Sequence, residues 1–496
     1  MKPFGSPSVY KKRRWPAATL LALAVLLTGP ATLYARTTPA SSTWMTVLLD
    51  GRKIGHARFT RTVAEDKITS VQYLQLELQR DGRPMVIETR ETDVESPAGK
   101  PLAFQSMTRV SGAESSTQGQ RRADGRFEVT SRVGGRESTT SMARPAGALL
   151  AEGQRLAAVR FGAEPGTDYA FLAWDVNSGK ALPTKNRVIG TERTSLPGGE
   201  RTLLRIEQTS TLPVGSVDTT LWLDGDFAAR KIRTSMLGMK LELLACDRAC
   251  AMAPNQGVDI LEKSMTAMPR ALTKAEVRGP ITYTIAATGS KPLHFADTDE
   301  QLVTRDDQGN WQVQVRLTPK ATQDKPVAAD TAANGWLQSD NRRLRRLAQQ
   351  ESRGASTDAA RMHKLETFVS RYINKKNLGV GYASALEVMR DREGDCTEHA
   401  VLLAALARSL DIPARVVTGL VYSDHYAGRD HVLVPHAWVQ AWVGDHWRSF
   451  DAALGGFDTG HIALETGDGD PWHFFAVANT LGKLRVVDVS SRQHKE

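Results

Sequence analysis

The sequence predicts an α+β fold in which a large antiparallel β-domain precedes a smaller domain of helices and strands. Residues 36–254 alternate apolar and polar positions and are interrupted by Asp-Gly turns, which is typical of hairpins. Residues 336–496 begin with apolar residues at helical spacing and then return to alternating runs. At 496 residues the chain is too long for one ordinary core, so more than one domain is expected.

The first 35 residues have the pattern of an export signal. A basic start is followed by an apolar run over 17–27, a Gly-Pro breaker and a cleavage point after Ala35. An uncleaved membrane anchor over residues 15–35 is the alternative, because Leu33 is bulkier than the usual residue at its place and the apolar run approaches membrane length. Either interpretation predicts an exported protein of the periplasm or cell envelope.

The net charge of +9 does not indicate a nucleic-acid partner. Five basic residues lie within the first 35 residues, which contain no acidic residue, and subtracting these five charges from +9 leaves +4. That charge is modest for a chain of this size, so we discount nucleic acid. The arginines between 342 and 346 fit the solvated face of a helix better than a site for an acidic partner.

The three cysteines divide into a pair and a single thiol. Cys246 and Cys250 stand four residues apart in CDRAC, a spacing that allows a local disulfide in an oxidising compartment. Two free structural thiols are the alternative. A zinc site would need two more ligands, and the chain has no second cysteine pair. Cys396 is the remaining thiol.

The region from about Trp44 to Leu244 predicts a large curved sheet or open barrel. The stretches LLDGRKIG, LQRDGRPM, RRADGRFEV and LWLDGDFAARKIR each place an Asp-Gly or Gly-Asp turn between strand-like runs. The region resembles exported β-domains of the lipoprotein-chaperone type. It has no cluster of acid–base groups, so we expect it to present or restrict substrate and not to be needed for the chemical step.

A mixed segment over 255–335 separates the two domains. ITYTIA and WQVQVRL predict strands, and the Ala, Asp and Pro-rich stretch KATQDKPVAADTAANG predicts a linker. The chain is therefore expected to consist of a signal or anchor over 1–35, the β-domain over 36–254, this segment, and a last domain over 336–496.

Three helices are predicted at the start of the last domain. DAARMHKLETFVSRYINKK has one apolar stripe, and a second helix begins at Ser384, which has capping-box spacing to Glu387. GDCTEHAVLL repeats this pattern. Asp395 is therefore the expected N-cap and Cys396 the first helical residue, with Glu398 as the capping partner.

A thiol in the first turn of a buried helix suits a nucleophile better than an inert core cysteine. Unpaired backbone N–H groups and the positive end of the helix dipole stabilise a thiolate there. An inert cysteine would belong among the leucines and alanines that follow Cys396. We therefore expect the pKa of Cys396 to lie well below the value of about 8.5 for free cysteine.

The strands that follow supply a histidine and a carboxylate. HAWVQAWVGDHWRSFDAA begins at His436, and its Gly-Asp pair is a favoured two-residue hairpin loop. In that register Asp451 lies opposite Trp438, so Asp451 and His436 become diagonal neighbours on one face, about 7–8 Å apart at the backbone. A slip of one residue would put them on opposite faces.

Together, GDC, LLAALARSLDIPARVV, HAW and W-x-x-F-D resemble the transglutaminase-like superfamily over about residues 340–480. The resemblance implies a papain-like core with Cys396 as the nucleophile, His436 as general base and acid, and Asp451 as the residue that orients the imidazole. It also implies Tyr382 as an oxyanion-side contact, beside the backbone N–H of Cys396.

The chemistry that the resemblance implies is acyl transfer. The thiolate attacks an amide carbonyl of a protein or peptide, at a glutamine side chain or a peptide bond, and a primary amine or water resolves the thioester. Asp411 stands where the family commonly has glycine, and Ala452-Ala453 follows the aspartate where Pro-Thr is usual. These departures leave the substrate open. An envelope cysteine peptidase and a non-catalytic binding module that keeps the fold are the alternatives.

No cofactor or metal is expected. His425, His431 and His446 have acidic neighbours, but their irregular placement favours ordinary polar loop residues over a metal site. His399 lies close to the thiol in sequence, and a solvent or packing role is expected for it. The chain has no recognisable calcium-binding loop.

Overall fold

The computed structural model describes residues 41–80, 82–212, 215–236, 238–288, 293–376, 382–470 and 483–491. The predicted signal or anchor over 1–35 lies outside these described residues. The described residues belong to one compact unit that spans Thr37–Glu496. Within them, no helix is both long and apolar enough to cross a membrane.

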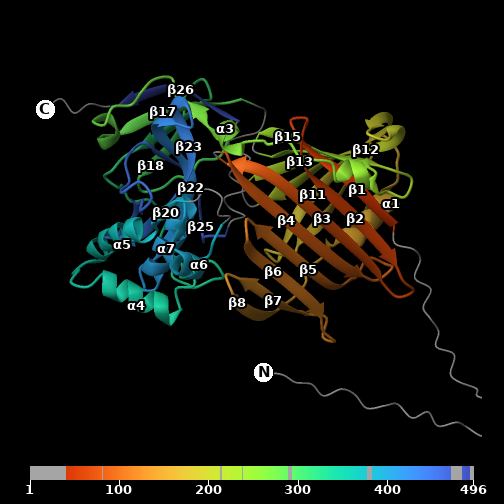
Figure 1. Cartoon of the computed structure of the whole chain (residues 1–496), viewed down its shortest axis with the longest axis horizontal. Helices are drawn as coiled ribbons and strands as arrows, with labels where there is room; N and C mark the ends of the chain where they lie inside the picture. Colours follow the sequence, from red (N-terminus) through yellow and green to blue (C-terminus); the bar gives the residue numbers. More distant parts are fainter. Residues whose placement is uncertain are drawn as a thin grey trace, which may run out of the picture. The chain divides into compact units, whose positions relative to one another are not determined.

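The N-terminal part of the described chain is a single antiparallel sheet of fifteen strands, apart from one short parallel pairing of β9 with β10 (Figure 1). Strands β1 to β8 form one run of hairpins, strands β10 to β15 form a second run, and β1 pairs with β15 to join them. The strands are β1 (Ser41–Leu49), β2 (Arg52–Val63), β3 (Ile68–Arg80), β4 (Arg83–Glu95), β5 (Pro101–Val110), β6 (Ala113–Arg121), β7 (Phe127–Val133), β8 (Arg136–Met142), β9 (Ala148–Leu149), β10 (Asp168–Asp175), β11 (Lys180–Leu196), β12 (Gly199–Leu212), β13 (Gly215–Leu223), β14 (Ala229–Met236) and β15 (Met239–Cys246).

Strands that are far apart in the order of the sheet pack against each other, so the sheet must be strongly curved. Phe104 of β5 and Phe127 of β7 contact Trp174 of β10, with ring centroids 5.1 and 4.9 Å from that of Trp174. The helix α1 (Ala151–Phe161) lies between β9 and β10 in the chain. The buried carboxylate of Glu95 accepts hydrogen bonds from the N–H groups of Glu152 and Gly153 in the first turn of this helix. The antiparallel β-domain that the sequence predicts is confirmed.

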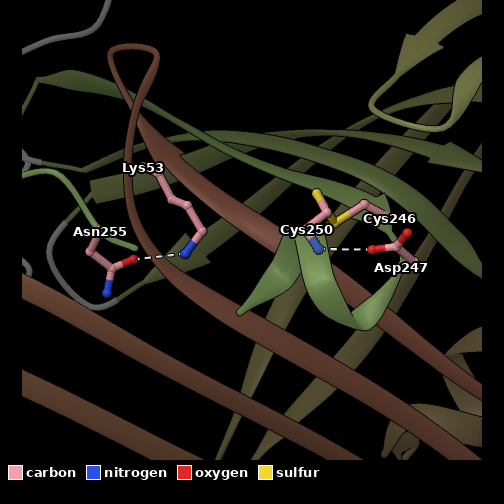
Figure 2. The surroundings of a disulfide bond; sticks show 5 residues. All are labelled: Lys53, Cys246, Asp247, Cys250 and Asn255. Atoms are coloured by element: carbon pink, nitrogen blue, oxygen red, sulfur yellow. Dashed lines mark hydrogen bonds between the residues drawn. A yellow bond between two sulfur atoms is a disulfide. The ribbon is translucent and has the colours of Figure 1, made fainter. Parts of the chain in front are cut away.

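A disulfide joins Cys246 at the end of β15 to Cys250 in the short helix α2 (Arg248–Ala251), with their Cα atoms 6.0 Å apart (Figure 2). Asp247 caps α2 by accepting a hydrogen bond of 2.8 Å from the Cys250 N–H. In the same corner, Lys53 of β2 donates a hydrogen bond of 2.8 Å to Asn255. The point where the chain leaves the sheet is therefore held covalently and by hydrogen bonds.

The segment between the two domains is built into the C-terminal one. After α3 (Ile260–Ser264), strand β16 pairs with β23, and β17, β18 and β19 form a sheet with β26 from the end of the chain. Their bounds are β16 (Thr266–Ala267), β17 (Ile281–Ala287), β18 (Gln301–Arg305), β19 (Trp311–Val315) and β26 (Leu484–Ser491), with single 3-10 turns at Glu276–Arg278 and Ala328–Asp330.

The stretch expected to be a linker, residues 320–335, is packed instead of free. Asp324 forms an ion pair of 2.6 Å with Arg415, and its carbonyl accepts a hydrogen bond of 2.9 Å from the buried Trp447 indole. The Ala332 carbonyl accepts a hydrogen bond of 2.8 Å from Arg408. Buried donors in the C-terminal domain therefore use the backbone of this stretch as their partner.

The C-terminal domain surrounds one buried helix. The helix α7 lies against β22 and β23, and α4, α5 and α6 pack on its other sides. The elements are α4 (Arg342–Glu351), α5 (Asp358–Tyr372), β20 (Lys375–Lys376), α6 (Ala385–Asp391), β21 (Glu393–Gly394), α7 (Cys396–Arg408), β22 (Ala414–Tyr426), β23 (Arg429–Val443), β24 (His446–Phe450) and β25 (His461–Gly467). Every residue of α7 after Cys396 is buried, as its run of alanines and leucines predicts.

The β23–β24 hairpin has the register that its two-residue loop requires. Val443 pairs with His446, and Val439 pairs with Phe450. Continuing this pairing by one residue places Asp451, directly after β24, opposite Trp438. His436 and Asp451 are therefore on the same face, as the sequence predicts.

We expect Gly419→Ala to destabilise this core by about 1–3 kcal/mol, the usual cost of overpacking. Gly419 pairs with His436, and a Cβ at this position would lie 2.1 Å from the Ile462 carbonyl oxygen on the neighbouring strand. The measurement is the free energy of unfolding from urea denaturation. Gly198→Ala is the control, because a Cβ there meets no atom within 4 Å, and equal stabilities of the two variants would contradict the prediction.

Candidate active site

Cys396 is the first residue of α7, and a buried turn fixes its place. The Asp395 carboxylate accepts a hydrogen bond of 3.0 Å from the Thr397 N–H, and the Glu398 carboxylate accepts one of 2.9 Å from the Asp395 N–H. A Cβ on Gly394 would lie 2.3 Å from the Cβ of Glu398, and the φ of Gly394 is +153°. Gly394, Asp395 and Glu398 therefore fix the backbone of this turn, and with it the position of Cys396 at the start of α7.

His436 and Asp451 form a buried hydrogen-bonded pair. His436 Nε2 and Asp451 Oδ2 are 2.7 Å apart, and the two side chains are 6% and 1% exposed. Because Asp451 engages Nε2, Nδ1 is the ring nitrogen left to exchange a proton with a neighbouring group. Cys396 and His436 line the same cavity, which has a volume of about 410 Å³.

His461 is a second histidine on Asp451, and sequence reasoning missed it. Its Nε2 lies 3.1 Å from Asp451 Oδ2, and its Nδ1 lies 3.0 Å from Asp458 Oδ1. His461 is the first residue of β25, which pairs with β22 beside β23. The available signal was a histidine at the start of the next alternating run, ten residues after Asp451.

Two histidines and several N–H groups keep the Asp451 carboxylate ionised. Burial acts to raise the pKa of Asp451, but the charges and hydrogen bonds of His436 and His461 outweigh it and hold the pKa well below its usual range. Its other oxygen accepts hydrogen bonds from the N–H groups of Ala453 and Leu454, at 2.8 and 3.2 Å. Burial lowers the pKa of His461, but its hydrogen bonds to Asp451 and Asp458 raise it overall.

The same three side chains are also a donor set that fits a metal ion. Within the described part of the chain, ligand atoms of His436, Asp451 and His461 lie within 4.8 Å of one another, and two imidazoles with a carboxylate suit zinc. Both imidazoles, however, already share one carboxylate oxygen through hydrogen bonds. An ion would have to displace these hydrogen bonds. In this structure the three side chains therefore form a hydrogen-bonded network.

The expected low pKa of Cys396 is wrong for this arrangement. Burial raises the pKa of the thiol, and the adjacent Asp395 carboxylate raises it further, while Arg80 and a hydrogen bond from the Ala437 backbone act against them. The expectation counted the dipole of α7 but not the charge of its own N-cap. The resting side chain is therefore a protonated thiol.

Tyr382, the candidate oxyanion contact, does not line the cavity. It is 8% exposed within the core cluster of the domain, and its ring packs edge-on against Trp336 with centroids 5.5 Å apart. Burial raises the pKa of Tyr382 well above its usual value. The backbone N–H of Cys396, at the open start of α7, remains the better placed donor for an oxyanion.

The other histidines that the sequence analysis considered are loop or packing residues. His425 pairs with Asp430 at 2.7 Å on the surface, His431 lies 3.3 Å from the Tyr422 hydroxyl, and His446 lies 3.6 Å from Asp299. They do not gather into a cluster in the described chain. His399 is a wall residue of the cavity, and its Nδ1 lies 2.5 Å from the Asp395 carbonyl oxygen.

Parts of the chain are similar to known proteins. The model of the transglutaminase-like superfamily matches residues 345–452. An uncharacterized protein of Mycobacterium leprae is 34% identical over 68 residues, which are 13% of this chain and 24% of that protein. The chain therefore matches about a quarter of the length of this relative.

Three solved structures are similar at low identity. A candidate cysteine protease of Cytophaga hutchinsonii is 20% identical, with 44% of this chain and 84% of that chain covered and a TM-score of 0.27. A β-barrel-like protein of a domain of unknown function from Brucella abortus is 10% identical, with coverages of 42% and 95% and a TM-score of 0.33. A candidate protease of Parabacteroides distasonis is 12% identical, with coverages of 78% and 70% and a TM-score of 0.20.

The match over 345–452 spans the helices α5 to α7, the strand β23 that carries His436, and the strand β24 that Asp451 directly follows. It agrees in position with the motifs from which the resemblance was inferred. The chain thus carries a transglutaminase-like superfamily domain at residues 345–452, preceded by a large antiparallel β-domain.

Proposed function

We propose that the chain is a thiol enzyme that attacks amide carbonyls through Cys396, His436 and Asp451. The observation that carries the proposal is the buried pair of His436 and Asp451 in the cavity that Cys396 also lines. A nucleophile, a base and a residue that orients the base are the parts that acyl transfer through a thioester requires. The membership of this domain in a superfamily that often contains thiol enzymes agrees with it.

The first half of the reaction breaks the amide. The Cys396 sulfur attacks the carbonyl carbon while its proton passes to His436 Nδ1, because the raised pKa of the thiol leaves it protonated at rest. The carbonyl oxygen becomes negative near the backbone N–H of Cys396. When the C–N bond breaks, His436 returns its proton to the departing nitrogen, and a thioester remains.

The second half releases the acyl group. Water or a primary amine attacks the thioester, and its proton passes through His436 to the Cys396 sulfur as the C–S bond breaks. Water gives a carboxylic acid, and an amine gives a new amide. Asp451 stays ionised throughout and stabilises the imidazolium that forms in each half.

The substrate we propose is a protein or peptide of the cell envelope. The cavity is lined by apolar, aromatic and cationic side chains, among them Leu261, Tyr422, Tyr426 and Arg83. The disulfide between Cys246 and Cys250 agrees with an oxidising compartment, and so does the export signal proposed for residues 1–35.

Cys396→Ser should abolish turnover, and Asp451→Asn should lower it by roughly a thousandfold to ten-thousandfold, because the imidazole loses its orienting charge. The assay supplies a glutamine-containing protein and a fluorescent primary amine, and follows label incorporation, ammonia and peptide release. Ammonia with label indicates transamidation, ammonia alone deamidation, and new peptide ends a peptidase.

Asp430→Asn is the matched control for Asp451→Asn. Asp430 also pairs with a histidine at 2.7 Å, but that pair is exposed on the surface, and its loss should leave turnover unchanged. If Cys396→Ser retains wild-type turnover, or if no product forms from any amide while the protein binds peptides, the binding-module alternative replaces the enzyme.

Iodoacetamide should label the resting Cys396 more slowly than free cysteine at pH 7.5. The thiolate is the reactive form, so a raised pKa moves the onset of labelling above the value of about 8.5 for free cysteine. Mass spectrometry of the labelled peptide over pH 5–11 measures the onset. Fast labelling at pH 6 would instead show a resting pair of thiolate and imidazolium, and would contradict the protonated resting state.

A further inference from the structure

We infer that Arg80, the last residue of β3 in the N-terminal sheet, is a positioning residue for the Cys396 thiol. The inference rests on the proposed function for the chemical role of Cys396. It reverses the expectation that the β-domain is not needed for the chemical step, since a residue of that domain forms part of the wall around the thiol. The argument starts from the contact that Arg80 makes.

Arg80 forms a salt bridge with Asp395, the N-cap of the helix that carries the thiol. Arg80 Nη1 contacts Asp395 Oδ2, and the two side chains are 16% and 7% exposed. The other oxygen, Oδ1, accepts the hydrogen bonds from the N–H and hydroxyl of Thr397, at 3.0 and 2.9 Å. One carboxylate therefore caps α7 with one oxygen and binds the sheet with the other.

The hairpin that carries Arg80 is anchored on both sides. The Gln79 N–H donates a hydrogen bond of 2.8 Å to the Val258 carbonyl, and the Gly82 N–H donates one of 2.9 Å to the Asp259 carboxylate. Asp259 also caps α3, whose Leu261 packs against β23 and lines the cavity. Arg80 is thus held in the wall of the cavity that the thiol lines and is not a free surface cation.

The charge of Arg80 favours the thiolate. Asp395 alone would oppose ionisation of the neighbouring sulfur, and Arg80 opposes that effect directly and by pairing with Asp395. The charged or titratable groups around the thiol are the N-cap Asp395, Glu398 and His399 of α7, His436 of β23, Tyr422 and Tyr426 of β22, and Arg80 and Arg83 of the sheet. Within this set, Arg80 forms a salt bridge with the N-cap.

Glu398, the other carboxyl group near the thiol, is largely uncharged at neutral pH. Burial, and then the nearby Asp395 charge, raise the pKa of Glu398 to about 8, so it is largely protonated at neutral pH. Its oxygens accept hydrogen bonds from the N–H groups of Ala383 and Asp395, at 3.0 and 2.9 Å. At neutral pH Asp395 is therefore the main negative charge beside the thiol, and Arg80 is its partner. Once Glu398 ionises at higher pH, its charge also raises the pKa of Cys396.

The test measures the pH onset of iodoacetamide labelling at Cys396 in the full chain. Arg80→Gln should slow labelling at pH 8.5 by about tenfold, which corresponds to a rise of about one pKa unit. Arg80→Lys keeps the charge and should restore most of the wild-type rate. Asp395→Asn keeps the helix cap but removes the negative charge, so it should shift the onset downward.

Arg136→Gln is the matched control. Arg136 of β8 pairs with Asp340 at 2.5 and 2.8 Å, so it also joins the sheet to the C-terminal domain, but it does not line the cavity. Its loss should leave the onset unchanged. If Arg80→Gln and Arg136→Gln have the same onset as wild type, Arg80 has no effect on the thiol and the inference is wrong.

A double substitution tests whether Arg80 acts through Asp395. In an Asp395→Asn background, Arg80→Gln should change the onset less than it does in the wild-type chain, and an equal change would exclude the route through Asp395. If Arg80→Gln fails to fold, Arg80→Lys and Asp395→Asn still show in which direction this salt bridge shifts the pH onset of labelling. Labelling needs no turnover, so an altered onset without amide turnover would leave this inference standing while the proposed function fails.

Discussion

The turn from Gly394 to Glu398 is the constraint on which the site depends. The thiol occupies its position because the side chains of Asp395 and Glu398 accept hydrogen bonds from the backbone of this turn. A helix that began one residue earlier or later would rotate the first side chain by about 100°. The cavity wall could be intact and the sulfur would still lie in a different place along it. The interactions of the N-cap therefore fix the place from which the thiol would act in the proposed reaction.

The site also shows three ways to bury a carboxylate. Asp395 is paired with an arginine, Asp451 is hydrogen-bonded by two histidines, and Glu398 is kept largely protonated at neutral pH. An unpaired charge at any of these places would cost several kcal/mol. In the reaction that we propose, the first pairing would adjust the thiol and the second would orient the base. The third holds the turn without adding a second negative charge beside the sulfur at neutral pH.

The features that the sequence predicted correctly depend on short-range interactions. The capping box at Asp395 and the register of the β23–β24 hairpin involve residues a few positions apart, so motif and spacing are enough to locate them. The features that were missed depend on contacts between distant segments. Arg80 is an ordinary strand residue until the fold brings it to Asp395, and His461 is an ordinary histidine until β25 pairs with β22. The pKa of Cys396 was misjudged because burial and the charge of Asp395 outweigh the helix dipole, and their sizes cannot be judged from motif and spacing.

The pairing of β17 with β26 sets the order in which the C-terminal domain can fold. β17 begins at Ile281, and its partner in the sheet extends to Ser491, near the end of the chain. The apolar side chains of Val486 and Val489 complete the core cluster that also contains Tyr283. Closing so long a loop is slow and has to come after the residues of β26 are synthesised. The C-terminal domain is therefore completed only after the residues of β26 have been made, and a chain that stops before them lacks part of the core that supports it.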